Sequence, residues 1–300
     1  MNKIVIVGCG SVGMAYAFSL INQKSNIDEL ILIDKDNKKA LGNAIDLSHT
    51  ALYNDHKVNI KAGSYIDCKD AKIVVIAAGV RQKPKETRLN LVSRNKIIIK
   101  EIVEKIVASG FKGIFLNVTN PVDIITYYIK KYSKFPSNKV IGTGTTIDTA
   151  RCKYLLSEKL EVRPTDIDLY VVGEHGDSLI IPYSSAKVGA LDIKDIMITS
   201  DLKQIETKVK KLPYKIIELK GETSFTIAMC LTRITNAIID DEYAVLTVSA
   251  PYNGIYIGMP SVINKNGIKG VMKIKLTNEE AKKLEDSIEI IENTISSMED

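Results

Sequence analysis

Short apolar runs alternate with helical stretches through the first half of this chain. Runs at 4–7, 30–33, 73–77, 114–117 and 140–141 predict strands, and helices are predicted to begin near Val12, Lys38, Leu89 and Val122. Nearly continuous apolar strands separated by helices are typical of a parallel sheet that is covered on both faces. Such a doubly wound α/β sheet binds ligands at the carboxyl ends of its strands. We therefore predict a nucleotide-binding type of domain over residues 1–142.

The second half has a different pattern and predicts an α+β domain over residues 143–300. Helices are expected at 147–160 and across 202–237, where Gly221 marks a break, and a strand is expected near 168–172. Three β-rich runs follow at 244–250, 256–263 and 270–274. Thr277 and Glu280 have the spacing of a capping box at the start of an amphipathic terminal helix. Since no linker separates the two halves, we expect them to pack closely together.

The composition fits a soluble globular protein, with 45% hydrophobic and 26% charged residues among 300. A net charge of +5 without a Lys/Arg block argues against a nucleic-acid partner. The first apolar run is too short to cross a membrane, so we expect neither a signal peptide nor a membrane anchor. The four cysteines form no C-x-x-C motif, which indicates reduced thiols in a cytoplasmic protein. No zinc-like His/Cys cluster occurs, so no metal is expected.

The first strand leads directly into a G-x-G-x-x-G pattern formed by Gly8, Gly10 and Gly13. Asp34 closes the second apolar run about 20 positions later, which is the spacing of a dinucleotide-binding motif. Gly8 permits the tight turn, Gly10 allows a pyrophosphate to approach, and Gly13 allows close packing of helix on strand. The Asp34 carboxylate suits the two hydroxyls of a ribose and would repel a 2′-phosphate, which favours NAD over NADP. The alternative is an ordinary turn between strand and helix.

Three polar residues of the second half are candidates for chemistry. Asp148 and Arg151 are three positions apart, so they share one face of the predicted helix. His175 lies between glycines in the run Gly-Glu-His-Gly-Asp, and histidine is the natural acid or base near neutral pH. Taken alone, the pair could be a surface salt bridge and the histidine an ordinary loop residue. The polar segment 81–88 is either a solvated loop or a mobile lid that carries Gln82 and Arg88 over a substrate.

Six motifs in unchanged order resemble those of the bacterial L-lactate dehydrogenases, which belong to the lactate/malate dehydrogenase superfamily. The resemblance runs from Lys3 to the final helix. The motifs are Gly8-x-Gly10-x-x-Gly13, Arg81-Gln82-Lys-Pro with Arg88-Leu-Asn-Leu-Val, Thr119-Asn-Pro-Val-Asp123, Asp148-Thr-Ala-Arg151, Gly173-Glu-His-Gly-Asp177 and Lys220-Gly-Glu-Thr-Ser224.

The resemblance implies an NAD-dependent enzyme that interconverts pyruvate and L-lactate, with a role for each matching residue. His175 is the proton donor and acceptor, Asp148 orients it, Arg151 grips the substrate carboxylate and Arg88 polarises the substrate carbonyl. The implied substrate-binding residues are Gln82, Arg88, Asn120, Asp123, Asp148, Arg151 and Thr223. The implied cofactor-binding residues are Gly8, Gly10, Val12, Gly13, Asp34, Lys39, Tyr65, Gly79, Val80, Val118, Asn120 and Thr143.

Two positions favour pyruvate as the substrate. Gln82 stands where relatives that act on malate carry arginine, and a neutral amide cannot pair with a second carboxylate. Thr223 stands where malate enzymes tend to have a smaller residue, so its bulk should limit the pocket to a methyl group. The alternatives are a malate dehydrogenase, a broader L-2-hydroxyacid dehydrogenase and a non-catalytic NAD-binding protein. The resemblance also implies a cytoplasmic homotetramer that acts in glycolysis and fermentation, with a homodimer as the alternative assembly.

Three residues depart from the family pattern. Lys85 stands in the predicted lid where the family commonly has glycine, which restricts the backbone and adds a charge. Lys153 and Asp168 occupy positions that in many bacterial relatives are Arg and His and bind fructose 1,6-bisphosphate. Because a carboxylate repels phosphate, activation by this sugar is expected to be weak or absent.

Overall fold

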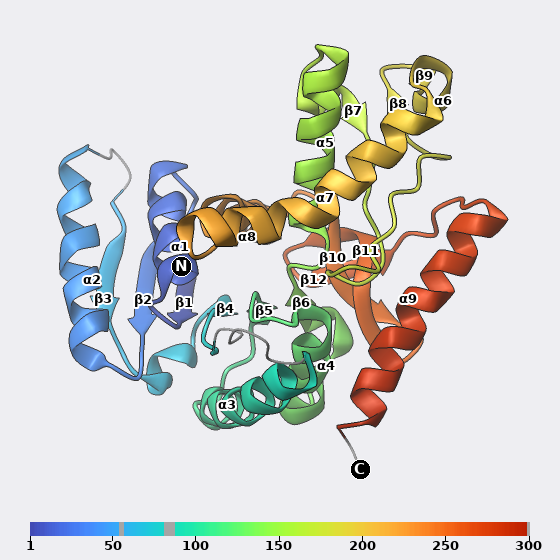
Figure 1. Ribbon diagram of the computed structural model, residues 1–300. Coiled ribbons are helices and arrows are strands. Elements are labelled where there is room, and N and C mark those ends of the chain that lie inside the picture. The colour runs from blue at the N-terminus through green and yellow to red at the C-terminus, as the bar shows by residue number, and fades with distance from the viewer. Residues whose placement is uncertain (54–56, 81–87, 299–300) are drawn as a thin grey trace.

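The computed structural model describes residues 1–53, 57–80 and 88–298, with only the backbone given for residues 88 and 89. The described residues include a nine-stranded sheet with the order β12-β11-β10-β6-β5-β4-β1-β2-β3 (Figure 1). Its six parallel strands are β1 (Lys3–Val7), β2 (Glu29–Ile33), β3 (Asn59–Ala62), β4 (Ile73–Ile76), β5 (Ile114–Asn117) and β6 (Val140–Gly142). Its antiparallel strands are β10 (Ala244–Tyr252), β11 (Ile255–Asn264) and β12 (Gly267–Val271).

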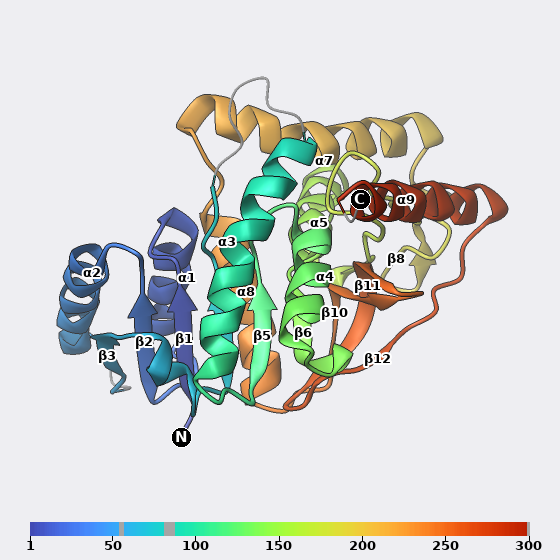
Figure 2. The same ribbon diagram turned by 90° about the horizontal axis from the view of Figure 1, so that it is seen from below.

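Helices cover both faces of the parallel part, as the continuous apolar strands predicted. On one face Ile4, Ile6 and their neighbours pack against α1 (Ser11–Asn22), α2 (Asn37–His49) and α8 (Phe225–Ile239). On the other face Val5, Val7 and their neighbours pack against α3 (Arg88–Ala108) and α4 (Val122–Ser133) (Figure 2). Because successive strand residues point to opposite faces, a strand that is buried on both faces carries no polar alternation.

The remaining elements of the second half form a layer beside this sheet. They comprise α5 (Thr146–Leu160), α6 (Ile193–Ile196), α7 (Thr199–Lys220), α9 (Asn278–Ser296) and a small sheet of β7 (Ile167–Asp168), β8 (Lys187–Val188) and β9 (Leu191–Asp192). Short 3₁₀ helices lie at Thr50–Tyr53, Tyr65–Cys68, Ser137–Lys139 and Pro164–Asp166. A separate apolar core joins α5 to α7 and to the small sheet.

The two halves of the chain share one sheet and one core, which confirms the expected close packing. Ser249 of β10 pairs with Gly142 of β6, so the antiparallel strands continue the parallel ones. The hydroxyls of Tyr16 on α1 and Thr235 on α8 are 2.6 Å apart in a fully buried contact. The long second-half helix α8 thus covers part of the first-half sheet.

Several predicted elements are confirmed, and a few were wrong. The helical region breaks at Gly221, whose φ of +85° ends α7, and Thr277 and Glu280 form the capping box of α9. The strand predicted at 168–172 is wrong, because β7 ends at Asp168 and Val172 makes only an isolated bridge to Ile180. The last β-rich run was placed too late, since β12 spans Gly267–Val271 and follows a tight turn from β11.

The strands that sequence reasoning missed are short or lie at edges. β3 alternates exposed and half-exposed residues at the edge of the large sheet, and β8 and β9 have two residues each. Such segments bury too little apolar surface to leave a recognisable pattern. Among the described helices, none is long and apolar enough to cross a membrane.

Candidate active site

The glycine turn at the end of β1 is tightly packed, and each glycine has a different reason to be there. Gly8 has a φ of +109°, and a Cβ there would lie 2.6 Å from the backbone nitrogen of Ala78. A Cβ at Gly13 would lie 2.1 Å from the carbonyl oxygen of Gly8, so only glycine lets α1 approach the turn. Gly10 is the N-cap residue of α1 and faces open space, where a phosphate could approach the first amides of the helix.

Asp34 is held against this turn in a position that suits a ribose. Its Oδ2 accepts a hydrogen bond from the backbone N–H of Cys9 at 2.8 Å, and its Oδ1 accepts one from Asp36 at 3.0 Å. Each carboxylate oxygen can accept more than one hydrogen bond, so both remain able to accept from ribose hydroxyls. The turn and the carboxylate therefore fit NAD. Burial raises the pKa of the neighbouring Cys9 thiol to about 11, so this cysteine is not a thiolate near neutral pH.

Asn95 of α3 holds together the loops that follow β4 and β5. Its Oδ1 accepts from the backbone N–H of Val80 at 2.8 Å, and its Nδ2 donates to the carbonyl of Asn120 at 2.8 Å. A Cβ at Gly79 would lie 2.6 Å from the Thr119 side chain, so these loops approach each other closely. Sequence reasoning missed Asn95, because one buried amide on an amphipathic helix with many other polar residues has no distinctive spacing.

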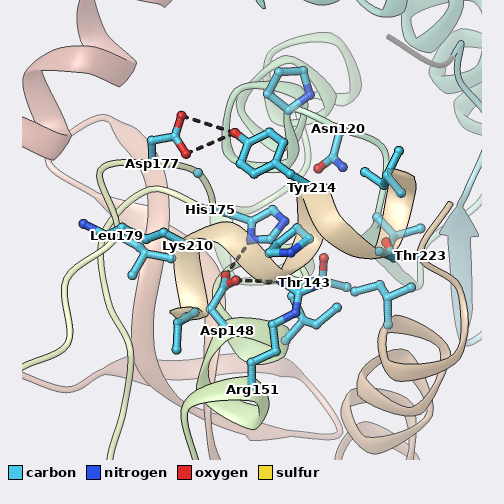
Figure 3. Close-up of a pocket in the computed structure, with 18 of the residues that line it drawn as sticks. Asn120, Thr143, Asp148, Arg151, His175, Asp177, Leu179, Lys210, Tyr214 and Thr223 are labelled. Atoms are coloured by element: carbon cyan, nitrogen blue, oxygen red, sulfur yellow. Dashed lines mark hydrogen bonds and ion pairs between the residues drawn. The ribbon is translucent and has the colours of Figure 1, made fainter. Parts of the chain in front are cut away.

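His175, Asp148 and Arg151 come together as one constellation (Figure 3). The Nδ1 atom of His175 lies 2.6 Å from Oδ2 of Asp148, and Nη1 of Arg151 donates to Oδ1 of Asp148 at 3.0 Å. The side chains of Asp148 and Arg151 are 2% and 10% exposed, whereas that of His175 is 22% exposed. The histidine ring is thus the accessible member of a buried charged group.

Burial and neighbouring charges have opposite effects on the pKa values of His175 and Asp148. Burial disfavours the charged imidazolium, but the charge and hydrogen bond of Asp148, together with Asp123, outweigh it and raise the pKa of His175 above its usual value. Burial also disfavours the Asp148 carboxylate, yet His175 and Arg151 outweigh it and hold the pKa of Asp148 below its usual range. The arrangement therefore favours an ionised Asp148 beside a histidine that can carry a proton near neutral pH.

Asp123 has a different place from the one expected of a substrate-binding residue. It is 1% exposed, and its carboxylate accepts from the backbone N–H of His175 at 2.8 Å and from the Ser249 hydroxyl at 2.6 Å. Both carboxylate oxygens therefore face protein groups behind the histidine. This burial and these two bonds do not support the predicted direct contact with a substrate.

A cavity of ≈ 410 Å³ opens beside His175, between the carboxyl ends of the parallel strands and α7. Its predicted lining residues are Val12, Val118, Asn120, Thr143, Asp148, Arg151, His175 and Thr223. Residues of α7 complete the wall, and sequence reasoning had given them no role. They include Lys210 and Tyr214, and the Tyr214 hydroxyl donates to the Asp177 carboxylate at 3.0 and 3.2 Å (Figure 3).

The other predicted residues divide into three groups. Gly8, Gly10, Gly13, Asp34, Gly79 and Val80 lie in the strand-end turns, while Lys39 is on α2 and Tyr65 in a 3₁₀ helix. Gln82 and Lys85 lie outside the described residues, and Arg88 begins α3 with its side chain outside that description. Lys153 and Asp168 lie on α5 and β7. Burial lowers the pKa of Lys153, and the nearby Asp168 carboxylate opposes this shift only in part.

The described part of the chain contains no group of three or more His, Cys, Asp or Glu side chains arranged to hold a metal ion. Its four cysteines are free and buried. A dinucleotide turn beside a histidine–aspartate–arginine constellation is the arrangement of a nicotinamide-dependent dehydrogenase, which transfers a hydride and a proton.

Comparison with known proteins agrees with this class. Residues 2–142 match the lactate/malate dehydrogenase NAD-binding domain, and residues 145–300 match the α/β C-terminal domain of the same family. The chain belongs to the lactate/malate dehydrogenase family. Within it, the chain is 45% identical to an L-lactate dehydrogenase of Geobacillus sp. (strain WCH70), covering 99% of this chain and 96% of that one. It is also 45% identical to L-lactate dehydrogenase 1 of Staphylococcus aureus (strain JH9), covering 100% and 98%.

Solved structures show the same fold over the full length. A lactate dehydrogenase from a Medee basin deep-sea metagenome library superimposes with a TM-score of 0.97 at 42% identity, covering 100% of this chain and 99% of that one. The minor L-lactate dehydrogenase of Enterococcus mundtii in its ligands-bound form gives 0.96 at 39% identity, covering 99% and 98%. Its ligands-unbound form gives a lower TM-score of 0.91.

Proposed function

We propose that this protein is an L-lactate dehydrogenase that reduces pyruvate to L-lactate with NADH and catalyses the reverse reaction. The observation that carries the proposal is the pairing of His175 with the buried Asp148 at the wall of a cavity, next to Arg151 and close to the dinucleotide turn. A nicotinamide cofactor held at the turn would supply a hydride as NADH and accept one as NAD⁺. The protein's own residues hold the substrate and move the proton.

In this proposal His175 delivers the proton to the substrate oxygen. The ionised Asp148 accepts a hydrogen bond from Nδ1, which leaves Nε2 as the nitrogen that serves the substrate. Because Asp148 raises the pKa of His175, the protonated ring is favoured when pyruvate binds and can act as a general acid. In lactate oxidation the neutral ring takes the proton back.

Arg151 has the position and chemistry to bind the substrate carboxylate. One of its nitrogens is fixed by Asp148, so the guanidinium is oriented while its other N–H groups stay available for a carboxylate. Fixing the substrate in this way converts binding energy into correct orientation. From the family resemblance we assign Arg88 to polarisation of the carbonyl, and Gln82 and Thr223 to selection of a methyl group at the far end of the substrate.

The test is NADH oxidation with pyruvate, oxaloacetate and 2-oxoisocaproate in parallel, on the unaltered protein and on His175→Ala. We expect the highest kcat/KM with pyruvate and a fall in kcat of about 10²–10⁴-fold in the variant, because general acid catalysis is lost. NADH binding should stay nearly unchanged, since His175 is not part of the glycine turn. A preference for oxaloacetate, or near-normal turnover in the variant, would contradict the proposal.

Finer features of the protein also remain proposals. We retain the division into residues 1–142 and 143–300 as cofactor and substrate units, and the cytoplasm, glycolysis and fermentation as the setting. We also expect little activation by fructose 1,6-bisphosphate, since the Asp168 carboxylate lies near Lys153.

We propose a homotetramer from the family resemblance, and exposed apolar side chains on neighbouring helices support the presence of a subunit interface. Phe18 on α1 and Phe225 on α8 are 52% and 73% exposed, and Met229 on α8 is 47% exposed. The helices α1 and α8 pack on each other, and Met229 contacts Ser19 of α1. Large apolar side chains gathered on one surface mark an interface between proteins.

A further inference from the structure

Behind His175 lies a buried polar cluster that the reaction described above does not use. It consists of Glu174, Ser178 and Ser287, which we call the Glu174 cluster, and none of the three lines the cavity. The Ser178 hydroxyl donates to the Glu174 carboxylate and lies 3.0 Å from Oγ of Ser287. The backbone N–H of Glu174 donates to the same Ser287 oxygen at 2.9 Å. The terminal helix α9 therefore reaches the residue next to His175.

The glycines that flank the histidine make room for this cluster. A Cβ at Gly176 would lie 3.1–3.2 Å from the carboxyl atoms of Glu174, and a Cβ at Gly173 would lie 3.1 Å from Oγ of Ser287. Gly173 also has a φ of +92°, which side-chain-bearing residues rarely adopt. The loop that carries His175 is thus wrapped closely around Glu174.

Two consecutive peptide groups beneath the histidine ring are held by two different helices. The N–H of Glu174 is bound by Ser287 of α9, and the N–H of His175 is bound by Asp123 of α4. Glu174 is 1% exposed and Ser287 is 0% exposed, so water does not compete for these contacts. A change of backbone position would break these contacts and leave buried polar groups without partners, which is costly. Buried polar contacts beside a residue that carries the proposed chemistry indicate a role in positioning that residue, here His175.

We propose that Glu174, Ser178 and Ser287 are positioning residues, which fix the backbone beneath His175 so that its Nδ1 atom stays within hydrogen-bonding distance of Asp148. The effect on turnover rests on the proposed function, whereas the effect on the ring does not. Displacement of a reacting group by about 1 Å can lower a rate about 10²-fold. The cluster acts through His175 and touches no reacting atom.

The direct test is an NMR titration of the His175 ring in Ser287→Ala and Ser178→Ala, two changes that leave every charge in place. Asp148 of α5 and Asp123 of α4 raise the pKa of His175, and burial and Arg151 lower it. If the ring moves away from Asp148, the titration midpoint falls. Ser261→Ala on β11 is the matched control, because Ser261 is also 0% exposed and bonds only a local carbonyl, that of Met259. We expect the midpoint to fall in both cluster variants and to stay unchanged in the control.

Pyruvate kinetics give a second, separate measurement. We expect kcat to fall about 10- to 100-fold in the cluster variants while the Kd for NADH is unchanged. A general loss of structure would instead lower kcat and also weaken the binding of NADH. An unchanged His175 midpoint in a folded cluster variant would overturn the proposal, as would a shift of equal size in Ser261→Ala. If Ser287→Ala does not fold, the less buried Ser178→Ala decides the question. Failure of the unaltered protein to reduce pyruvate would contradict the proposed function alone, because the titration needs no substrate.

Discussion

At the scale of single residues, the candidate active site is built from buried charged side chains that pair with one another. Asp148 is shared between His175 and Arg151, and each partner uses a different carboxylate oxygen. One anion can therefore orient the proposed proton donor and the proposed substrate-binding cation at the same time. The sequence spacing indicated the pair formed by Asp148 and Arg151, whereas the pairing of His175 with Asp148 followed only from the family resemblance. The fold supplies the contact itself, with Nδ1 of His175 at 2.6 Å from Oδ2 of Asp148.

The first residue-scale prediction concerns pH. In the proposed mechanism the protonated form of His175 donates a proton to pyruvate, so kcat/KM should fall as the pH rises through the raised pKa of this histidine. In Asp148→Asn the stabilising charge is gone while burial still disfavours the imidazolium, so the midpoint of the pH profile should move to lower pH. The measurement is kcat/KM for pyruvate against pH in both proteins. An unshifted midpoint would show that Asp148 does not govern the protonation of His175.

The second residue-scale prediction concerns the choice of cofactor. A 2′-phosphate would place its charge near the Asp34 carboxylate, and two unit charges about 5 Å apart at an effective dielectric of 20 repel by about 3 kcal/mol. This corresponds to roughly 10²-fold in kcat/KM in favour of NADH over NADPH. Steady-state kinetics with both cofactors, repeated on Asp34→Asn, test it. Equal values for NADH and NADPH in the unaltered protein would mean that Asp34 does not face the ribose.

At the scale of elements, the first-half strands other than β3 were predictable because burial on both faces leaves a continuous apolar run. The helix α9 was equally clear, since its capping box and its apolar positions agree. Elements that bury little, such as β3 and β8, leave no comparable pattern. The cavity wall supplied by α7 could not be predicted either, because its contacts depend on where that helix crosses the His175 loop.

The helix α7 provides the element-scale prediction. Tyr214 joins α7 to Asp177, two residues beyond His175, and this bond ties the helix to the loop at the edge of the cavity. We expect Tyr214→Phe to raise the KM for pyruvate a few-fold and to change the free energy of unfolding by less than about 1 kcal/mol, because Tyr214 is 61% exposed. Tyr154→Phe, at a 56% exposed tyrosine on α5, is the matched control. Identical KM values in the two variants would exclude this role for the bond.

At the scale of the whole molecule, the sequence indicated two units, and the structure joins them through one sheet. Residues 2–142 and 145–300 match two different family domains, yet β10 to β12 extend the sheet that β1 to β6 begin. Sequence patterns show which segments are strands but not which strands are neighbours. The pairing of β10 with β6 is therefore a feature that only the structure could reveal.

The whole-molecule prediction is the mass of the assembled protein. A homotetramer of 33.2 kDa chains has a mass of about 133 kDa, which sedimentation equilibrium can measure. Phe225→Glu places a charge on the exposed apolar surface and should shift the protein towards smaller species, while Leu219→Glu, a change at a 75% exposed side chain of α7, serves as the comparison. A monomer at micromolar concentration in the unaltered protein would refute the tetramer.

The order in which the chain is made gives the shared sheet a further consequence. When a ribosome has released β6, the neighbour of that strand in the finished sheet is still roughly 100 residues away, from Gly142 to Ala244. Because synthesis proceeds at about 5–20 residues per second, the edge of β6 stays unpaired for about 5–20 s before β10 has been made. An unpaired apolar edge can pair with another nascent chain during that interval. Codon choice and chaperone supply across this stretch should therefore influence the yield of folded protein more than similar changes near the carboxyl terminus.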